Sequence, residues 1–293
     1  MKHLKVRIPM YFIGLFIMTI GIALSVKSNL GVSPVSSIPY TMTCVWGIEM
    51  GKATILFHIV LVVIQILLLR KKFKPVQLLQ ILVGIVFGYF TTFCNYIVSY
   101  LPTPHNLAIR IVMVLASTVF VAFGIFLYLP ADLIPLAGEG CMQAVSTVTN
   151  IEFSRVKIGF DCTMVVVSAV TCLVMLHSLG SVGAGTIIAA ILVGTFVGMI
   201  NRTFGSQRDA LLGKNEKAAA EAARVAERDH ISADAAAAKI KKVNHERAVH
   251  CKHFTKTDWG NVKNYDLCIK SDDFGVEDTA KIIRELFQKK MGV

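Results

Sequence analysis

Six stretches of the chain are almost entirely apolar over the length that a helix needs to cross a bilayer. A helix rises about 1.5 Å per residue, so roughly 20 apolar residues span the hydrocarbon core. The stretches are residues 8–26, 53–69, 78–100, 108–129, 157–177 and 183–201. The pattern therefore predicts an all-α polytopic membrane protein with six transmembrane helices.

Part of this pattern occurs twice. Residues 21–58 resemble residues 124–161 at a separation of 103, most clearly in GIEMGKATILFH and NIEFSRVKIGFD. The likeness resumes where LVGIVFG, residues 82–88, matches LVGTFVG, residues 192–198. Each copy holds three spans, and because three is odd the second copy enters the membrane from the opposite side. The sequence thus predicts two inverted three-helix repeats, an arrangement typical of secondary transporters.

Each copy contains a long connection between its first two spans, residues 27–52 and residues 129–155. Both connections begin with a proline or glycine break, continue into a short apolar stretch, and are too apolar for a solvated loop. Irregular backbone at membrane depth is tolerated where it is buried in protein or lines a cavity. Two such breaks at equivalent places indicate a binding site near the midplane. The alternative is an amphipathic helix lying at each membrane surface.

The basic residues beside the spans predict the orientation. With the N-terminus inside, the inner segments carry 11 Lys and Arg residues and the outer segments carry 3. Cytoplasmic loops are enriched in Lys and Arg. We therefore expect a multi-pass membrane protein with both termini cytoplasmic, and an uncleaved first helix.

The composition divides the chain in two. Residues 1–205 hold 13 basic and 5 acidic residues, whereas residues 206–293 hold 17 and 14. This predicts a transmembrane domain over 1–205, a linker helix over 206–220 and a polar tail over 221–293. The net charge of +11 comes from dispersed bases, many beside apolar runs, which argues against nucleic-acid binding. The seven cysteines include no Cys-x-x-Cys pair, and no metal site is expected.

Polar residues inside or beside the apolar segments are the candidates for a substrate pathway. Intramembrane ionisable groups are costly and usually face a bundle interior or a water path. His58 and Asp161 occupy equivalent positions just inside their spans, Glu49 and Glu152 directly precede those spans, and Asn29, Ser33 and Asp132 lie at the two breaks. The shallow depth of His58 and Asp161 leaves open that these groups only cap helices.

The stretch GIALSVKSNLGVSPVSSIPYTMT resembles the opening of the YczE/YyaS/YitT family of bacterial membrane proteins. The likeness extends over about residues 1–214, ending at NRTFGSQRDALLGK. The resemblance implies an integral protein of the bacterial plasma (inner) membrane, for which the transported solute, if any, is not established. Val35-Ser36 stands where the family often has an aromatic residue and an acid.

The tail combines helical segments with one short strand. Residues 215–241 are rich in alanine with interspersed charges, which favours helix, and Ser232 is a candidate N-cap for a second helix. A strand is expected at 265–269 and an amphipathic helix at about 276–288. The tail is thus predicted to be a small cytoplasmic α/β fragment that needs further strands to form a sheet.

Residues 221–288 resemble the C-terminal half of the cytidylate-kinase-like family, through RVAERDHIS, KIKKVNHERA and DWGNVKNYDLCIKSDDFGVE. The resemblance implies that Arg224, Arg228 and Arg247 bind phosphate groups. No phosphate-binding loop precedes this segment. ATP and Mg²⁺ are therefore expected only if a partner chain completes the tail, and no other cofactor is implied.

These features favour a permease of an unidentified small solute in the lipid bilayer. A second hypothesis is a membrane-tethered nucleoside monophosphate kinase that binds nucleotide or is completed by a partner chain. A third is a membrane scaffold that transports nothing. The oligomeric state does not follow from the sequence.

Overall fold

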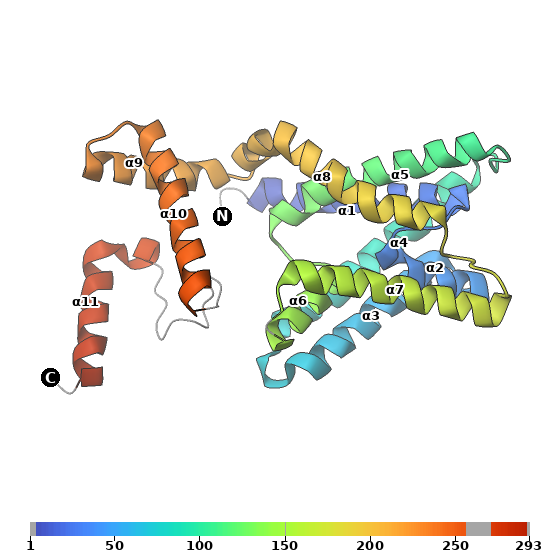
Figure 1. Cartoon of the computed structure of the whole chain (residues 1–293), viewed down its shortest axis with the longest axis horizontal. Helices are drawn as coiled ribbons and strands as arrows, with labels where there is room; N and C mark the ends of the chain where they lie inside the picture. The colour runs from blue at the N-terminus through green and yellow to red at the C-terminus, as the bar shows by residue number, and fades with distance from the viewer. Residues whose placement is uncertain (1–3, 150, 256–270, 292–293) are drawn as a thin grey trace. The chain divides into compact units, whose positions relative to one another are not determined.

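The computed structural model describes residues 4–149, 151–255 and 271–291, and it divides into two units, Met1–Asn215 and Glu216–Val293. The described residues form helices and contain no strand (Figure 1). In the first unit the long helices are α1 (Leu4–Ser28), α3 (Met50–Leu69), α4 (Leu79–Ser99), α5 (Leu107–Tyr128), α7 (Phe153–Leu176) and α8 (Ala184–Leu211). Two shorter helices are α2 (Pro34–Trp46) and α6 (Ala137–Thr149), and three 3₁₀ turns are η1 (Arg70–Lys72), η2 (Pro75–Leu78) and η3 (Leu129–Ala131).

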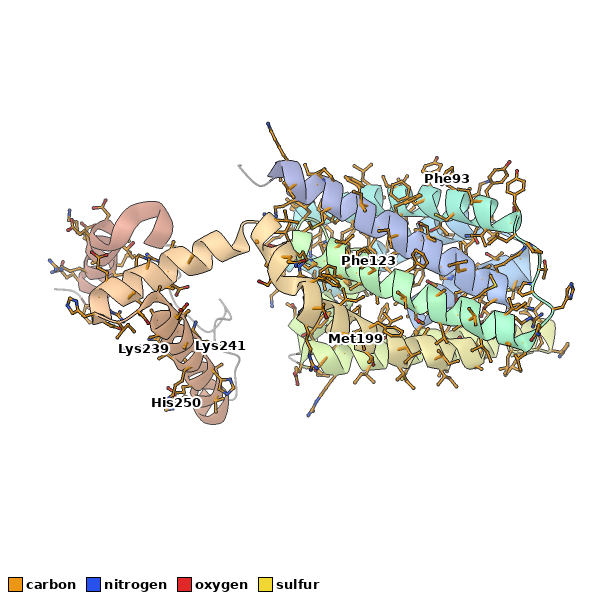
Figure 2. All side chains as sticks on the ribbon, turned by 90° about the horizontal axis from the view of Figure 1, so that it is seen from above. Phe93, Phe123, Met199, Lys239, Lys241 and His250 are labelled. Carbon is orange, nitrogen blue, oxygen red and sulfur yellow. The ribbon has the colours of Figure 1, made fainter. Side chains whose placement is uncertain are left out.

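Six helical segments are long and apolar enough to cross a membrane, which confirms the number and approximate positions of the predicted spans. Many large apolar side chains on them are exposed to the surroundings of the bundle. Phe93, Phe123 and Met199, for example, point outward from their helices (Figure 2). In water such a surface would be costly, whereas hydrocarbon solvates it. The first unit is therefore a membrane domain.

The helices of the first unit occur in the order long, short, long, long, and this order is repeated. The short helices α2 and α6 begin 103 residues apart and end 103 residues apart, and so do the starts of α3 and α7. The helical segments before the two short helices end at equivalent residues. Asn29 and Asp132 both adopt a left-handed backbone conformation with φ 52°. Asn and Asp tolerate this conformation better than most residues. Both breaks predicted from the sequence are therefore present.

Contacts between the helices also follow the repeat. Helix α1 packs on α4 as α5 packs on α8, and α2 packs on α7 as α6 packs on α3. The first helices of the two halves, α1 and α5, cross each other in opposite directions and make the most extensive helix pair of the unit. One pairing is not repeated, since α3 packs closely on α4 whereas α8 lies mainly against α5.

Small residues allow the close approach of α1 and α5. A Cβ atom on Gly14 would lie 2.9 Å from the Gly124 carbonyl oxygen, and one on Gly21 would lie 2.8 Å from the Ser117 carbonyl oxygen. Gly14 and Ser117 are 103 residues apart, as are Gly21 and Gly124. The contact of Gly14 with Gly124 therefore becomes the contact of Ser117 with Gly21 when the two halves are exchanged. Small residues at such crossings are common in membrane helices.

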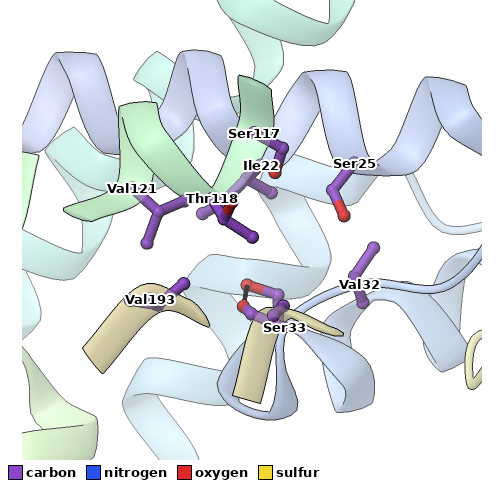
Figure 3. A pocket seen from close by; sticks show the side chains of 10 residues that line it. Ile22, Ser25, Val32, Ser33, Ser117, Thr118, Val121 and Val193 are labelled. Atoms are coloured by element: carbon purple, nitrogen blue, oxygen red, sulfur yellow. Dashed lines mark hydrogen bonds between the residues drawn. The ribbon is translucent and has the colours of Figure 1, made fainter. Parts of the chain in front are cut away.

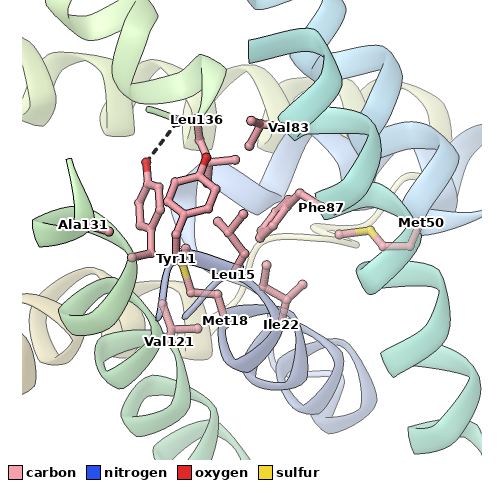
Figure 4. Close-up of a cluster of buried hydrophobic side chains, with 11 residues drawn as sticks. Tyr11, Leu15, Met18, Ile22, Met50, Val83, Phe87, Val121, Ala131 and Leu136 are labelled. Atoms are coloured by element: carbon pink, nitrogen blue, oxygen red, sulfur yellow. Dashed lines mark hydrogen bonds between the residues drawn. The ribbon is translucent and has the colours of Figure 1, made fainter. Parts of the chain in front are cut away.

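Around this crossing lies the largest apolar core of the bundle (Figure 4). It combines Tyr11, Leu15 and Met18 of α1 with Phe87 of α4 and Tyr128 of α5. The glycine-rich turn before α8 is also closely packed, and the Gly185 N–H donates to the Leu30 carbonyl oxygen at 2.7 Å. These contacts hold the break after α1 against the start of α8.

The second unit contains α9 (Lys214–Asp229), α10 (Ala233–Thr255) and α11 (Ser271–Met291). Ser232 accepts the Ala235 N–H at 3.2 Å, so it caps α10 as predicted. Gly275 is not helical, and the continuous helix after it agrees with the predicted amphipathic helix at 276–288. The strand expected at 265–269 lies outside the described residues. Helix α8 continues to Leu211, so part of the expected linker 206–220 belongs to the last spanning helix.

Candidate functional site

The two short helices begin close to each other in the interior of the bundle. A Cβ atom on Gly138, in the first turn of α6, would lie 3.6 Å from Val35 in the first turn of α2. These two residues are themselves 103 residues apart. Apolar side chains from α3, α6 and α7, including Phe57, Ala137 and Met164, surround the meeting point. The positive ends of two helix dipoles therefore point toward one region of the protein interior.

A small pocket lies at the beginning of α2 (Figure 3). In this conformation the volume of the pocket has room for about one water-sized molecule. Its polar side chains are all hydroxyls, and its apolar walls come from α1, α5 and α8. The hydroxyl residues are Ser25, Ser33, Ser36, Ser117 and Thr118. The residues that line it include no acid and no base.

Three of these hydroxyls already have acceptors. Ser25 donates to the Gly31 carbonyl oxygen at 3.0 Å, Ser33 donates to the Ser36 oxygen at 3.1 Å, and Thr118 donates to a carbonyl oxygen of its own helix. The side chain of Ser33, the N-cap of α2, makes no capping bond, while the Ser33 carbonyl oxygen accepts the Ser36 N–H at 2.9 Å. Among the described residues, nothing hydrogen-bonds to the Ser117 hydroxyl, which belongs to a residue only 4% exposed. The pocket thus presents donor groups that remain available to a ligand.

The beginning of α6 is built differently. Glu139 lies in its first turn and accepts a hydrogen bond from the Tyr128 hydroxyl, which in turn accepts the Leu136 N–H at 2.9 Å. Tyr11 packs on Tyr128 and donates to the Ile134 carbonyl oxygen at 2.6 Å. A carboxylate in the first turn balances the positive end of a helix dipole. At the beginning of α6, the Glu139 side chain is therefore the anion that balances the helix dipole.

Glu139 was not among the candidates predicted from the sequence. A signal for it was present, because it is one of only 5 acidic residues within 1–205. Its partner Tyr128 lies at the end of an apolar stretch, where the sequence gives no sign that its hydroxyl has a specific partner. Only the fold places that hydroxyl beside the carboxylate.

A pair of buried amides lies beside α6 as well. Gln65 of α3 donates to Gln80 Oε1 at 2.9 Å and to the Ala137 carbonyl oxygen at 3.1 Å. A Cβ atom on Gly140 would lie within 2.7 Å of both amide groups. Glycine at 140 thus allows two polar side chains to pack against the start of α6.

His58 and Asp161 occupy equivalent positions but have different surroundings. His58 is buried, stacks on Phe87 with 5.7 Å between ring centres, and lies against Gly84. Asp161 pairs with Lys157 on its own helix at 2.9 Å. In the described part of the chain, no hydrogen bond or ion pair joins His58 to Asp161. A role in a substrate pathway stays a prediction for both.

The two glutamates lie at helix N-termini, as their positions suggest. Glu49 accepts the Gly51 N–H at 2.8 Å, the Lys52 N–H at 3.1 Å and the Thr92 hydroxyl, so it caps α3 and ties it to α4. Glu152 is the N-cap residue of α7, makes no side-chain capping bond and is exposed.

Of the three polar residues at the breaks, only Ser33 lines the pocket. Asn29 and Asp132 are exposed and mark the left-handed ends of α1 and of the turn after α5. Asp132 lies 3.6 Å from Arg7. Both residues suit the left-handed backbone conformation that they adopt. A direct part in a substrate pathway stays a prediction for both.

The arginines expected to bind phosphate lie on the tail helices. Arg228 pairs with Asp229 at 2.8 Å, and Lys239 pairs with the same carboxylate at 2.9 Å. Hydrogen bonds from Arg228 and Lys239 hold the pKa of Asp229 well below its usual range. Arg224 and Arg247 are exposed on α9 and α10. Any phosphate would thus compete with Asp229 for Arg228. Among the described residues, no cluster of His, Cys, Asp or Glu could hold a metal ion.

Six apolar spans, interrupted by two short helices that meet in the interior, define a polytopic membrane protein. The chain belongs to a family of unknown function (DUF6198), whose model matches residues 5–202. It is also similar to the uncharacterized membrane protein YczE of Bacillus subtilis (strain 168), with 26% identity over 194 residues, 66% of this chain and 84% of that protein.

The tail has a separate relationship. Residues 216–273 match the model of the cytidylate kinase-like family, in agreement with the resemblance found in the sequence. No solved structure matches the chain.

Proposed function

We propose that the protein is a permease in which a small solute passes between the beginnings of α2 and α6. The observation that carries this proposal is the meeting of two interrupted segments in the bundle interior, at Val35 and Gly138. Discontinuous helices at equivalent places of two repeats form the midplane sites of many transporters. The hydroxyl pocket next to this meeting point offers polar groups inside an otherwise apolar bundle.

An inverted relation between the halves is part of the proposal. It is supported by the matching helix boundaries, by the exchange of packing partners and by the antiparallel crossing of α1 and α5. In this arrangement the break at Asn29 opens to the outer face and the break at Asp132 to the cytoplasm, as the distribution of Lys and Arg indicates. Rocking of one repeat against the other would expose the site to each face in turn.

The tail is proposed to be a cytoplasmic appendage rather than a kinase. Its match covers residues 216–273, and the membrane domain precedes it where a phosphate-binding loop would be needed. Binding of a nucleotide at Arg224, Arg228 and Arg247, with ATP and Mg²⁺ supplied through a partner chain, is the second hypothesis carried over from the sequence.

Permeation can be measured by light scattering of vesicles that contain the purified full-length protein. After a rapid change of medium, the swelling rates with urea, with glycerol, and with potassium formate plus valinomycin are compared with those of protein-free vesicles. At least one probe is expected to enter several times faster with the protein. Gly138→Phe is expected to abolish this increase, because the ring fills the meeting point of α2 and α6.

Gly159→Phe is the matched control, since nothing lies within 4 Å of a Cβ atom at Gly159. This variant is expected to behave like the unaltered protein. Equal rates for protein-containing and empty vesicles with all three probes would contradict permeation. Unchanged swelling in the Gly138→Phe variant would contradict the proposed path.

A further inference from the structure

The two short helices differ at equivalent positions in a way that indicates a ligand. Glu139 in the first turn of α6 corresponds, 103 residues earlier, to Ser36 in the first turn of α2. Tyr128, which donates to Glu139, corresponds in the same way to Ser25. Both serines line the pocket. The small side chains of α2 and α1 thus leave open a space that a carboxylate and a phenol occupy in the other half.

We infer that this pocket binds a small monovalent oxyanion, with the size and geometry of a carboxylate such as formate, at the beginning of α2. The anion would stand in the first half where the Glu139 carboxylate stands in the second. The inference rests on the proposed function, because it names the class of solute that occupies the path.

The charges around the pocket favour an anion. A helix N-terminus carries roughly half a positive charge and unpaired N–H groups. Here the first turn of α2 contains no acidic residue and no side-chain cap. Pro34 has no N–H and the Ser36 N–H donates to the Ser33 carbonyl oxygen at 2.9 Å, so the Val35 N–H is the backbone donor of this turn that faces a ligand. The residues that line the pocket include no carboxylate that would attract a cation. The positive end of α6 lies nearby but is already balanced by Glu139, so the attraction for an anion comes from α2 alone.

Hydrogen-bond donors in the pocket suit oxygen acceptors. The Ser117 hydroxyl has no partner within the described part of the chain, although its residue is almost completely buried. Ser36, which is 9% exposed, accepts from Ser33 and keeps its own proton free to donate. The Ser117 oxygen keeps some accessible surface, because it opens into the pocket. One oxyanion that accepts from Ser36 and Ser117 would satisfy both groups.

The size of the pocket restricts the ligand. Its present volume accommodates about one water-sized molecule, and its walls are apolar residues such as Ile22, Val121 and Val193. A large or multiply charged anion would lack both space and compensating charge. Formate is larger than one water molecule, so the pocket walls have to move apart to admit it. A compact monovalent anion is the class of ligand that needs the smallest such movement.

Binding can be tested on the purified full-length protein in detergent by thermal unfolding. Sodium formate is titrated against sodium gluconate at constant ionic strength. A ligand that binds the folded state raises the unfolding temperature in a saturable manner. Formate is expected to do so, and Ser36→Ala and Ser117→Ala are each expected to weaken its apparent affinity about tenfold.

Ser168→Ala is the matched control, because Ser168 is an equally buried hydroxyl that donates to Ser37 outside the pocket. Its formate affinity is expected to equal that of the unaltered protein. Absence of a formate-dependent shift would overturn the inference. So would an unchanged affinity in both pocket variants, or a shift that follows sodium when choline replaces it.

The outcomes also separate this inference from the proposed function. Accelerated entry of urea or glycerol into vesicles, without formate binding, would leave the permease intact and overturn the anion site. Formate binding that depends on Ser36 and Ser117, in a protein that accelerates no probe, would support the site and contradict permeation.

Discussion

Replacing Gly124 with leucine is expected to prevent the membrane domain from folding. A Cβ atom at this position would lie 2.6 Å from the Gly14 carbonyl oxygen and 2.8 Å from the Met18 backbone nitrogen. Backbone atoms cannot rotate away, so α1 and α5 would have to separate along their whole crossing. The cost is expected to exceed about 4 kcal/mol, the range in which single substitutions are exceptional. Size-exclusion chromatography of a fluorescent fusion in mild detergent measures the loss of the monodisperse peak.

The control is Gly159→Leu, which places the same side chain on a spanning helix where nothing lies within 4 Å of the new Cβ atom. Its chromatogram should match that of the unaltered protein. A normal peak and unfolding temperature for the Gly124→Leu variant would mean that α1 and α5 do not cross at these glycines.

The second large effect is expected at Glu139. Changing it to alanine leaves the buried Tyr128 hydroxyl without its acceptor and the first turn of α6 without a carboxylate. A buried donor without a partner costs about 1–3 kcal/mol, so the unfolding temperature of the purified protein should fall by several degrees. Glu139→Gln keeps an acceptor oxygen and should lose clearly less stability.

Tyr128→Phe completes a double-mutant cycle with Glu139→Ala. If the two side chains stabilise the protein through their shared hydrogen bond, the double variant should lose less stability than the sum of the single variants. Strict additivity of the two effects would contradict a direct interaction between Tyr128 and Glu139.

Much of the architecture is predictable from the sequence. The six spans follow from apolar stretches of sufficient length, because a helix must satisfy its own backbone hydrogen bonds in lipid. The separation of 103 residues between GIEMGKATILFH and NIEFSRVKIGFD also predicts where the second half breaks. The starts of α2 and α6, and of α3 and α7, follow this separation.

The roles of individual polar residues are harder to predict. Asn29 and Asp132 are polar residues at the breaks, which suits both a substrate pathway and a left-handed helix end. The structure shows the second role for both. Ser33 differs because the chain turns back into the bundle after Gly31 and brings this residue to the pocket.

The residues that contact His58 could not be predicted from the sequence, for a different reason. Its position inside a span indicates burial, but the face of α3 on which it lies is decided by packing against Gly84 and Phe87 of α4. The part that Ser36 and Ser117 play in the pocket is equally hard to predict. Nothing in the sequence around either serine indicates that the fold brings the two residues to one pocket.

The inverted repeat is tested most directly by labelling two equivalent residues from the two sides of the membrane. Asn29→Cys and Asp132→Cys are introduced separately into a variant without native cysteines, since both positions are exposed. Intact spheroplasts and inside-out vesicles are then treated with a maleimide that does not cross membranes. His105→Cys, between α4 and α5, and Lys72→Cys, after α3, mark the outer and inner faces.

Asn29→Cys is expected to react in spheroplasts, as His105→Cys does, and Asp132→Cys is expected to react in inside-out vesicles, as Lys72→Cys does. Labelling of Asn29→Cys and Asp132→Cys from the same side would contradict the inverted repeat and the path proposed between α2 and α6.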